Sequence, residues 1–365
     1  MLSPLKKVKS SRNFDLELVK KFGLLLFTSA LSLFLFELGF RGYLAITNSG
    51  SLEKQLERSK LESVSNSTLG VSLGGLIRPS KFKDIVYELK PNISVIFQSK
   101  PVITNSLGMR EKEVEVRKQP KVQRIIGLGD SIMFGWGVEK NETYLNILES
   151  LLNTKTPTEV LNFGVPGYNT AMEVALFERN AKSFSPDTIV VQFVNNDFDV
   201  PAFMLSQEDP WDFSKSILLS FVSSRLDNSQ LNNSLGKKVG LVTVQSMGNR
   251  KNLESQKVLL EYKWMTGEAG ATKAFRKLRE LAPNTKIVVL TGSKTPVQQR
   301  MLNKLSKELN FSLVEIGPVV DRYFRENNLE NNKEIRKQLL TVAPNDRHPS
   351  PLGHKLIAQA LAEAL

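Results

Sequence analysis

From residue 124 to the carboxyl terminus, short runs rich in β-branched residues alternate with amphipathic stretches that are long enough to form helices. A strand–helix–strand succession builds a parallel sheet, because each helix carries the chain back to the edge where the next strand begins. The sequence therefore predicts an α/β fold, a three-layer α/β/α sandwich around a mostly parallel, five-stranded sheet. The expected strands are Arg124–Leu128, Val160–Phe163, Thr188–Val194, Lys286–Leu290 and Leu313–Ile316, and the expected helices are Tyr144–Asn153, Thr170–Ser183, Leu259–Leu281, Pro296–Leu309 and Pro351–Ala364.

Residues 199–254 interrupt this alternation. They contain Pro201, Pro210 and Trp211, and a stretch rich in Asn, Ser and Gly follows at 227–236. Functional loops of a parallel sheet collect at the carboxyl ends of its strands, and the insertion follows such an end. Two interpretations stay open: a lid or substrate platform, and a surface excursion without a catalytic role.

The amino-terminal region contains an apolar run. Residues Phe22 to Phe36 carry no charge, Glu37 and Arg41 can pair one helical turn apart, and apolar character resumes to Ile46. A bilayer core needs about 20 residues of helix, so the sequence predicts a transmembrane signal anchor at 22–46. A buried core helix and a cleaved signal peptide are the alternatives; no cleavage site with small residues follows the run, which disfavours cleavage.

The charges before the run predict its orientation. The first 21 residues contain six Lys or Arg residues against Asp15 and Glu17, so they are expected to form a cytoplasmic tail. Everything after residue 47 then lies on the periplasmic side of the cytoplasmic membrane. Residues 47–120 are expected to form a stalk, partly helical around Glu53–Glu62, and a lead-in with irregular β structure at Asp84–Arg110. The α/β domain is expected to occupy 121–365.

Composition excludes several kinds of chemistry. The chain has no cysteine, which rules out disulfides, thiolate metal ligands and a cysteine nucleophile. Its two histidines, His348 and His354, cannot form a three-histidine zinc site. The net charge of +12 is partly concentrated in the first 21 residues and is otherwise spread thinly. No nucleic-acid-binding motif accompanies it, so nucleic acid is not an expected partner.

The first candidate for chemistry is a serine that follows the first strand, in the stretch Gly129–Val138. A serine at a strand-to-helix turn is lifted above the sheet, and its backbone N–H faces the same space as its hydroxyl. Both features suit a nucleophile whose intermediate carries an oxyanion. The alternative is that Ser131 merely caps the following helix.

Two further blocks follow the next two strands. In Leu161–Thr170, Gly167 has no side chain to block its N–H, which can donate to an oxyanion; an ordinary turn is the alternative. In Val194–Asp197, Asn196 offers a neutral amide donor at the rim of the sheet; a loop amide satisfied by its neighbours is the alternative.

The fourth block, Asn345–His354, precedes the last helix. It places Asp346 two residues before His348. An imidazole can take a serine proton while a carboxylate holds its tautomer and stabilises the imidazolium, although a histidine near a helix start is often only a surface or capping residue. His354 is expected to be a packing or solvent-facing residue.

These four blocks, in this order, resemble the SGNH (GDSL-type) hydrolase family from about Arg124 to the carboxyl terminus. Two lead-in stretches, Tyr87–Asn92 and Asn105–Arg110, look like those of membrane-anchored bacterial members. The resemblance implies that Ser131 is the nucleophile and that His348 is the base. It also implies an oxyanion hole formed by Ser131 N–H, Gly167 and Asn196.

Two positions depart from the family pattern. Val194 stands where a glycine is usual, which can narrow the pocket. The last block is often Asp-x-x-His, but here Asn345 holds that position and Asp346 lies two residues before His348. Some members use a serine–histidine dyad, so two candidates for orienting His348 remain: Asp346 and a backbone carbonyl.

The expected function is therefore that of a membrane-anchored, extracytoplasmic serine esterase that forms an acyl-serine and needs no metal or other cofactor. The expected substrate is an ester, in particular an acylated, most simply acetylated, glycan of the envelope. One alternative is an O-acyltransferase that modifies an envelope polysaccharide. Another is a non-catalytic relative that binds glycan.

Overall fold

The computed structural model describes residues 12–48, 67–71, 73–82, 84–205, 211, 213, 216, 218–219, 241–243, 262–292, 294–329 and 332–365. Residues 1–51 and 207–232 form one compact unit, and residues 52–206 and 233–365 form a second, larger one. The predicted helical part of the stalk, 53–62, lies outside the described residues.

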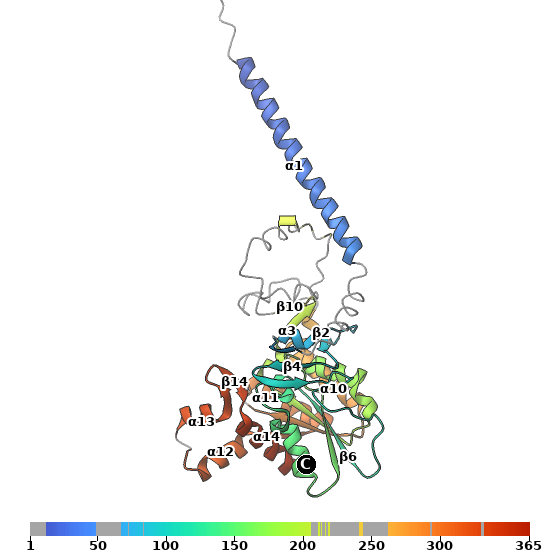
Figure 1. The fold of residues 1–365 in the computed structure, drawn as a ribbon, viewed down its shortest axis with the longest axis vertical. Coiled ribbons are helices and arrows are strands. Elements are labelled where there is room, and N and C mark those ends of the chain that lie inside the picture. Colours follow the sequence, from blue (N-terminus) through green and yellow to red (C-terminus); the bar gives the residue numbers. More distant parts are fainter. Residues whose placement is uncertain are drawn as a thin grey trace, which may run out of the picture. The chain divides into compact units, whose positions relative to one another are not determined.

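A five-stranded, fully parallel sheet is the centre of the larger unit, as the sequence predicts (Figure 1). Its order is β12-β11-β8-β6-β7. In this order β7 lies on one side of β6 and β8 lies on the other, so the connections diverge at the carboxyl end of β6. Functional sites of parallel sheets usually lie at such a point. The strands are β6 (Gln123–Leu128), β7 (Thr158–Asn162), β8 (Thr188–Phe193), β11 (Lys286–Thr291) and β12 (Ser312–Glu315).

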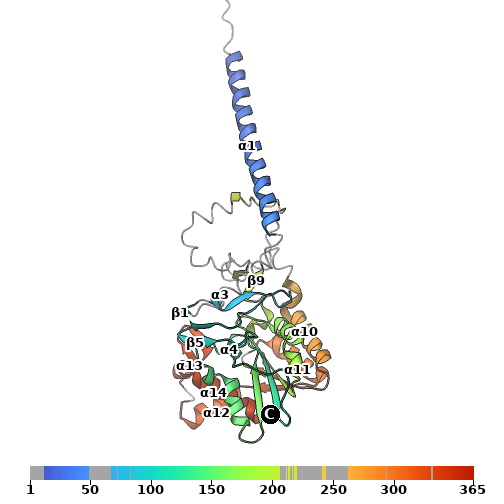
Figure 2. The same cartoon turned by 45° about the vertical axis from the view of Figure 1, so that its right-hand side comes forward.

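Helices cover both faces of this sheet, and two apolar cores result. Successive strand residues point to opposite faces, so Ile125 packs in one core and Ile126 in the other. Figure 2 shows α10 and α11 on one side of the sheet and α12 and α14 on the other. The first face is covered by α6 (Thr170–Arg179), α10 (Gly267–Leu281) and α11 (Pro296–Leu309), and the second by α5 (Tyr144–Leu152), α12 (Gly317–Glu326) and α14 (Pro351–Ala364).

The predicted helix boundaries are confirmed in α11 and α14 and differ by one residue in α5, which ends at Leu152. Two other helices differ more. Of the predicted helix Leu259–Leu281, residues 259–261 lie outside the described residues. A short 3-10 turn, η7 (Lys263–Met265), comes next, and the regular helix begins at Gly267. The backbone is extended at Thr266 and left-handed at Gly267, with a φ of 67° that glycine adopts readily. The predicted helix Thr170–Ser183 ends at Arg179, and a separate 3-10 turn, η2 (Ala181–Phe184), follows.

Short strands form between residues 84 and 110, in agreement with the expected irregular β structure. Two strands and a short helix between residues 67 and 79 form where a stalk was expected. These elements share the core of the α/β domain. Tyr87, Phe97 and Val102 belong to the same apolar cluster as the sheet and α6. The Tyr87 hydroxyl also donates to the carbonyl of Pro166, at 2.9 Å. The elements are β1 (Ser67–Gly70), α3 (Leu73–Leu76), β2 (Ile77–Pro79), β3 (Tyr87–Leu89), β4 (Ser94–Phe97) and β5 (Lys100–Ile103).

Several elements were not expected from the sequence. The helices α12 and α13 (Lys333–Leu340) are followed by an antiparallel hairpin of β13 (Thr341–Ala343) and β14 (Asp346–Pro349). Within the predicted insertion, β9 (Phe203–Leu205) pairs with β10 (Leu241–Thr243). Short helical turns occur at α4 (Ser131–Phe134), η1 (Lys140–Glu142) and η3 (Asn195–Phe198).

The smaller unit contains the helix α1 (Arg12–Asn48). Its segment Glu17–Tyr43 has a mean hydropathy of 1.8 and is long and apolar enough to cross a membrane. The predicted span 22–46 lies within α1. The expected ion pair is present, since Arg41 Nη2 lies 2.7 Å from Glu37 Oε1.

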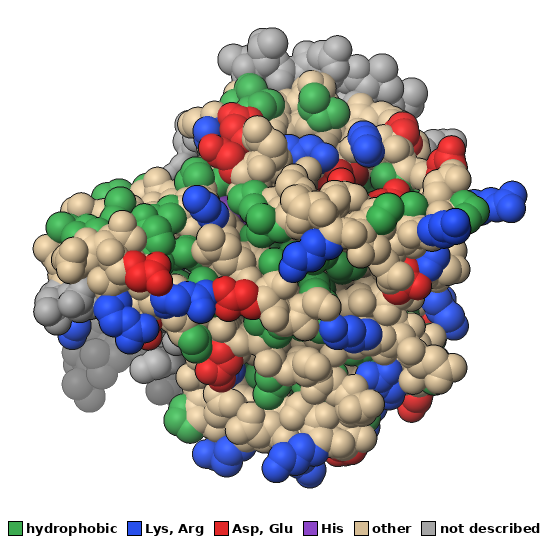
Figure 3. Space-filling view, turned by 90° about the horizontal axis from the view of Figure 1, so that it is seen from below, with side chains coloured by type: hydrophobic (Ala, Val, Ile, Leu, Met, Phe, Trp, Pro, Cys, Tyr) green, Lys and Arg blue, Asp and Glu red, His purple; other side chains and the backbone are tan. Residues whose placement is uncertain are grey.

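Charge is distributed over the surface of the larger unit without a single-sign patch on the face drawn in Figure 3. Lys and Arg side chains there are interspersed with Asp, Glu and apolar side chains. This distribution matches the thin spread of basic residues beyond the first 21.

Candidate active site

Ser131 is the first residue of α4, directly above the end of β6. Asp130 caps this short helix, because its carboxylate accepts the N–H of Ile132 at 3.0 Å. The alternative that Ser131 is itself the cap is therefore wrong, and its hydroxyl is available for other contacts. Gly129 is required by space, since a Cβ there would lie 2.8 Å from the Cβ of Met133.

The serine hydroxyl begins a series of three hydrogen-bonded side chains. Ser131 Oγ lies 2.8 Å from His348 Nε2, and His348 Nδ1 lies 2.5 Å from Asp346 Oδ1. The backbone N–H of His348 donates to the same carboxylate oxygen at 3.0 Å. The structure thus brings together the three residues that the fourth block and the nucleophile turn supply.

The hairpin explains how a carboxylate two residues before the histidine reaches its ring. Asp346 and His348 both lie in β14, and residues two apart in a strand project from the same face. A two-residue turn, Pro344-Asn345, joins β13 to β14. Asn345, at the position where the family usually has its aspartate, therefore lies in the turn rather than in the strand.

Trp136 holds the Asp346–His348 pair in place, a role that the sequence pattern did not predict. Its Nε1–H donates to Asp346 Oδ2 at 3.0 Å. Its ring stacks on the imidazole of His348, with centroids 4.6 Å apart and planes 13° apart. The only local signal is an aromatic residue between Gly135 and Gly137, just after α4.

Arg110, from the lead-in, fixes the loop that carries Trp136. Its guanidinium is buried and donates to the carbonyls of Gly135 at 2.7 Å and Val138 at 2.9 Å. Burial lowers the pKa of Arg110 to about 10, so the side chain stays charged at neutral pH. Nothing in the spacing of the four blocks indicates this contact, because Arg110 precedes the α/β domain.

The two predicted oxyanion donors lie on either side of the nucleophile turn. Asn196 Nδ2 donates to Asp130 Oδ2 at 3.2 Å, which places the amide beside Ser131. The Gly167 block is connected to the same turn, since Val165 N–H donates to Gly129 O at 3.0 Å.

Gly167 itself cannot carry a side chain. Its φ is 80°, and a Cβ there would lie 2.2 Å from the Cβ of Ala202. The close approach of Ala202, whose N–H donates to Gly167 O at 2.9 Å, is the physical reason for the glycine.

Val194, where the family usually has glycine, has an extended backbone with φ −128° and ψ 174°. Any residue adopts this conformation, so the backbone does not demand glycine. The N–H of Val194 donates to Asp197 Oδ2 at 2.6 Å, and Thr170 Oγ1 donates to Asp197 Oδ1 at 2.6 Å. Asp197 thereby ties the Asn196 turn to the start of α6.

Electrostatics differ between the carboxylates of the site. Partial burial opposes the ionisation of Asp346, but hydrogen bonds from the His348 backbone and ring and from Trp136 outweigh it and lower its pKa. Burial raises the pKa of Asp130, against its hydrogen bonds from Ile132 and Asn196. The ionised form is therefore favoured at Asp346, the carboxylate that is hydrogen-bonded to the imidazole.

His354 is a packing residue, one of the two outcomes expected for it. It is fully buried between α14 and α5, where its ring stacks on Tyr144 with centroids 5.7 Å apart. Its Nδ1 accepts the backbone N–H of Tyr144 at 3.2 Å. Burial lowers the pKa of His354 to about 3, so the ring is neutral.

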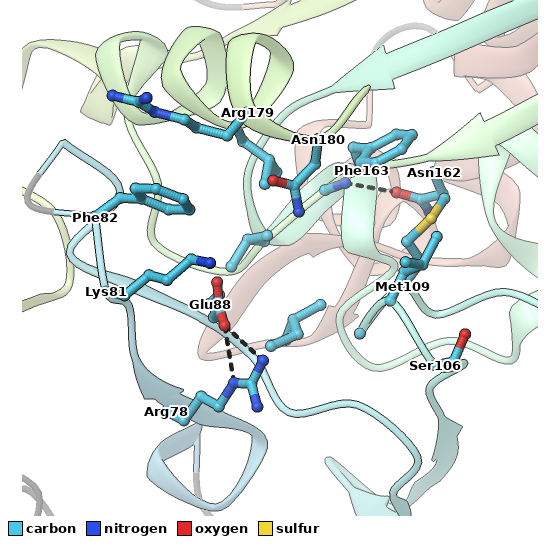
Figure 4. A pocket seen from close by; sticks show the side chains of 16 residues that line it. Arg78, Lys81, Phe82, Glu88, Ser106, Met109, Asn162, Phe163, Arg179 and Asn180 are labelled. Atoms are coloured by element: carbon cyan, nitrogen blue, oxygen red, sulfur yellow. Dashed lines mark hydrogen bonds and ion pairs between the residues drawn. The ribbon is translucent and has the colours of Figure 1, made fainter. Parts of the chain in front are cut away.

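A cavity of about 400 Å³ lies apart from the Ser131–His348–Asp346 series (Figure 4). It is bounded by the β2–β3 hairpin, the end of α6 and the Asn162–Val165 segment. Arg78 at its wall pairs with Glu88 at 2.6 Å, and Arg179 pairs with Asp84 at 3.1 Å. Two of its three cationic groups are thus neutralised, and none of its lining residues belongs to the series.

The described part of the chain offers no cluster of three or more His, Asp or Glu side chains that could hold a metal ion. The serine is hydrogen-bonded to a histidine, and the histidine is hydrogen-bonded to a carboxylate. This arrangement at the edge of a parallel α/β sheet is typical of α/β serine hydrolases.

The model of the GDSL-like Lipase/Acylhydrolase family matches residues 128–356, more than half of the chain. The chain belongs to this family and is a hydrolase of ester bonds. The match covers all four sequence blocks. No curated protein sequence matches the chain significantly.

Solved structures with low identity also match. Axe2, an acetylxylan esterase from Geobacillus stearothermophilus, is 15% identical with a TM-score of 0.38, and the match covers 66% of this chain and 93% of that one. A member of the lipolytic protein G-D-S-L family from Veillonella parvula DSM 2008 is 14% identical with a TM-score of 0.36, covering 67% and 98%. At this level of similarity they carry no argument about substrate.

Proposed function

We propose that this chain is a serine esterase in which Ser131 is the nucleophile and His348 the general base. The observation that carries the proposal is the 2.8 Å contact between Ser131 Oγ and His348 Nε2, continued to Asp346 at 2.5 Å. These distances suit proton transfer between neighbours without any rearrangement of the side chains.

The proposed reaction has two halves, formation of an acyl-serine and its hydrolysis. His348 Nε2 takes the proton of Ser131 Oγ while the oxygen attacks the ester carbonyl carbon. The tetrahedral intermediate collapses, the imidazolium protonates the leaving alcohol, and an acyl-serine remains. In the second half His348 takes a proton from water, which attacks the acyl carbon. The bond from the acyl carbon to Ser131 Oγ then breaks, the imidazolium returns its proton to Oγ, and the acid is released.

Three donors bind the oxyanion in both halves: the N–H groups of Ser131 and Gly167 and the amide of Asn196. Removing one such donor from a hydrolase typically costs about 3 kcal/mol of transition-state stabilisation. Asp346 stabilises the imidazolium and holds the ring so that Nε2 faces the serine. The lowered pKa of Asp346 supports this role, because only the ionised carboxylate balances the imidazolium charge.

The proposed location is the periplasmic side of the cytoplasmic membrane, with α1 as a single-pass anchor. The support is the apolar segment Glu17–Tyr43 together with the six basic residues in the first 21. An enzyme held at that surface meets envelope polymers, so the proposed substrate is an acylated, in the simplest case acetylated, glycan. Transfer of the acyl group to a sugar hydroxyl uses the same acyl-serine.

The test is hydrolysis of aryl esters of increasing acyl length by the full-length chain in detergent. Ser131→Ala is expected to retain less than about one per cent of the activity, with the free energy of unfolding changed by less than about 1 kcal/mol. Ser150→Ala, an exposed serine on α5, is the matched control and is expected to be fully active. Substantial activity in Ser131→Ala would exclude the nucleophile assignment.

Two additions separate the alternatives. Labelling of the wild type but not of Ser131→Ala by a serine-directed phosphonate is expected of a catalytic protein, and an unlabelled wild type would favour a non-catalytic glycan-binding relative. A glycan acceptor is then added to the assay. Less release of acetate, together with formation of acylated glycan, would favour the acyltransferase.

A further inference from the structure

Five described residues of the insertion, Trp211, Phe213, Ser216, Leu218 and Leu219, belong to the same compact unit as α1, and we call them the docking residues. Three of them contact a charged pair on α1. Ser216 Oγ and the N–H of Leu218 donate to Glu37 Oε2 at 2.9 and 3.0 Å. The guanidinium of Arg41 lies over the Phe213 ring, with Arg41 Cζ 4.6 Å from the centroid of the ring.

These contacts add to an ion pair within α1. The other carboxylate oxygen of Glu37, Oε1, accepts Arg41 Nε at 2.8 Å and lies 2.7 Å from Nη2. Both carboxylate oxygens are thus bonded, and the side chains of Arg41 and Glu37 are only 2% and 13% exposed. The docking residues cover an ion pair that a lone helix would present to its surroundings.

The position of the Glu37–Arg41 pair along α1 indicates how deep the pair lies in a bilayer that α1 spans. Lys20 and Lys21 end the basic tail, and α1 rises about 24 Å from Lys21 to Glu37. The hydrocarbon core of a bilayer is about 30 Å thick. With the lysines at the cytoplasmic interface, Glu37 lies near the outer boundary of the core, where an ionised side chain needs paired partners.

Large apolar side chains of the docking residues and of α1 are exposed. Trp211, Phe213 and Leu219 are 53%, 60% and 73% exposed, and Tyr43 on α1 is 61% exposed. Trp and Tyr are enriched at membrane interfaces, where one part of the ring is apolar and the other is hydrated. Their place beside a membrane-spanning segment favours lipid as the group that covers them.

We propose that the docking residues form a second membrane contact, which enters the outer leaflet of the bilayer beside α1. Their partner is phospholipid at the boundary between headgroups and acyl chains. The proposal rests on the membrane anchoring proposed for α1 and is independent of the esterase chemistry. It gives this part of the insertion a role other than a lid or a substrate platform.

The test is the depth of Trp211 in vesicles of phosphatidylcholine and phosphatidylglycerol. Trp136→Phe and Trp264→Phe leave Trp211 as the sole tryptophan of the full-length chain. Its emission is expected to shift to shorter wavelength in vesicles. Lipid brominated near the headgroup is expected to quench it at least twofold more strongly than lipid brominated at the end of the acyl chain.

A second single-tryptophan chain, Phe34→Trp with all three native tryptophans replaced by Phe, reports the insertion of α1 itself. Quenching of that residue without quenching of Trp211 overturns the second contact and leaves the anchor intact. Absence of both signals overturns the anchor as well. Shielding of Trp211 from aqueous acrylamide without quenching by brominated lipid shows that protein covers the surface, which also overturns the proposal.

Ser216→Ala tests whether the Glu37 contact places the docking residues. It removes one of the two donors that the docking residues give to Glu37 Oε2. The quenching of Trp211 is expected to weaken while that of the Phe34→Trp reporter is unchanged. Equal quenching of Trp211 with and without the Ser216 hydroxyl contradicts the positioning role of this hydrogen bond.

Discussion

At the scale of single residues, the site depends on which group orients His348. Asp346 Oδ1 accepts both the ring Nδ1–H and the backbone N–H of His348, and Trp136 donates to its other oxygen. A carboxylate with three donors is fixed in orientation, so its replacement by an amide disturbs the imidazole tautomer as well as the charge balance. Asp346 therefore has a testable part in catalysis.

Asp346→Asn is expected to lower kcat by about 10³- to 10⁴-fold, with little change in KM. His348→Asn is expected to be at least as severe, because His354 is buried in packing and cannot replace it. Steady-state kinetics on an aryl acetate measure both. If Asp346→Asn stays within about threefold of wild type while His348→Asn is inactive, the enzyme uses a Ser131–His348 dyad.

At the scale of elements, the β13–β14 hairpin determines which position can supply the carboxylate. Residues 346 and 348 share a face of β14, whereas residue 345 lies in the turn. The strand β14 thus explains why the carboxylate lies two residues before the histidine here, and not three as in the usual Asp-x-x-His spacing. The stacking of Trp136 on His348 keeps this strand against the nucleophile loop.

The double variant Asn345→Asp, Asp346→Asn restores the spacing that is usual in the family. Because residue 345 lies in the turn, the transferred carboxylate is expected to miss the imidazole, and the double variant should be as slow as Asp346→Asn alone. The variant Asn345→Asp, with Asp346 intact, is the control and should keep kcat within about twofold of wild type. Recovery of activity in the double variant would show that the turn can deliver the carboxylate.

A buried carboxyl on η3 makes the stability of the larger unit depend on pH. Burial raises the pKa of Asp197 to about 8, although hydrogen bonds from Thr170 and Val194 oppose the shift. Burial likewise raises the pKa of Glu173, which faces Asp197. Between the ordinary pKa near 3.8 and about 8 the folded chain keeps a proton that the unfolded chain loses.

The free energy of unfolding is therefore expected to fall as pH rises through this window, since the folded state binds more protons. Asp197→Asn keeps the shape of the protonated carboxyl and should make the dependence shallower. Urea unfolding at a series of pH values measures the slope. Glu334→Gln, an exposed side chain on α13, is the control and should leave the slope unchanged; a slope equally unchanged in Asp197→Asn would contradict this role of the buried carboxyl.

At the scale of the whole molecule, the orientation of α1 decides which substrates the esterase meets. The basic residues ahead of the apolar segment predict that residues 48–365 lie outside the cytoplasmic membrane. Protease added to intact spheroplasts is expected to digest this region while a cytoplasmic control protein survives. Protection of residues 48–365 beside cleavage of a periplasmic control would refute the orientation.

Much of the architecture could be predicted because its signals are local. The five strands and the helices α11 and α14 follow from apolar periodicity and turn residues within short windows of sequence. Helix α13 gives a weaker signal, because it is only eight residues long and none of its residues is buried. The start of α10 was missed because a left-handed glycine, and not hydrophobicity, decides it.

The strand–helix alternation and the apolar segment of α1 could be predicted from the order of residues. So could the placement of Ser131, Gly167, Asn196 and His348 near strand ends and turns. Only the tertiary structure decided that Asp130 and not Ser131 caps α4, and that Trp136 and Arg110 support the site. Trp136 lies 210 positions from Asp346, and Arg110 lies 25 from Gly135. Such contacts depend on the order of strands in the sheet and on the hairpin that faces it, and no local propensity encodes either.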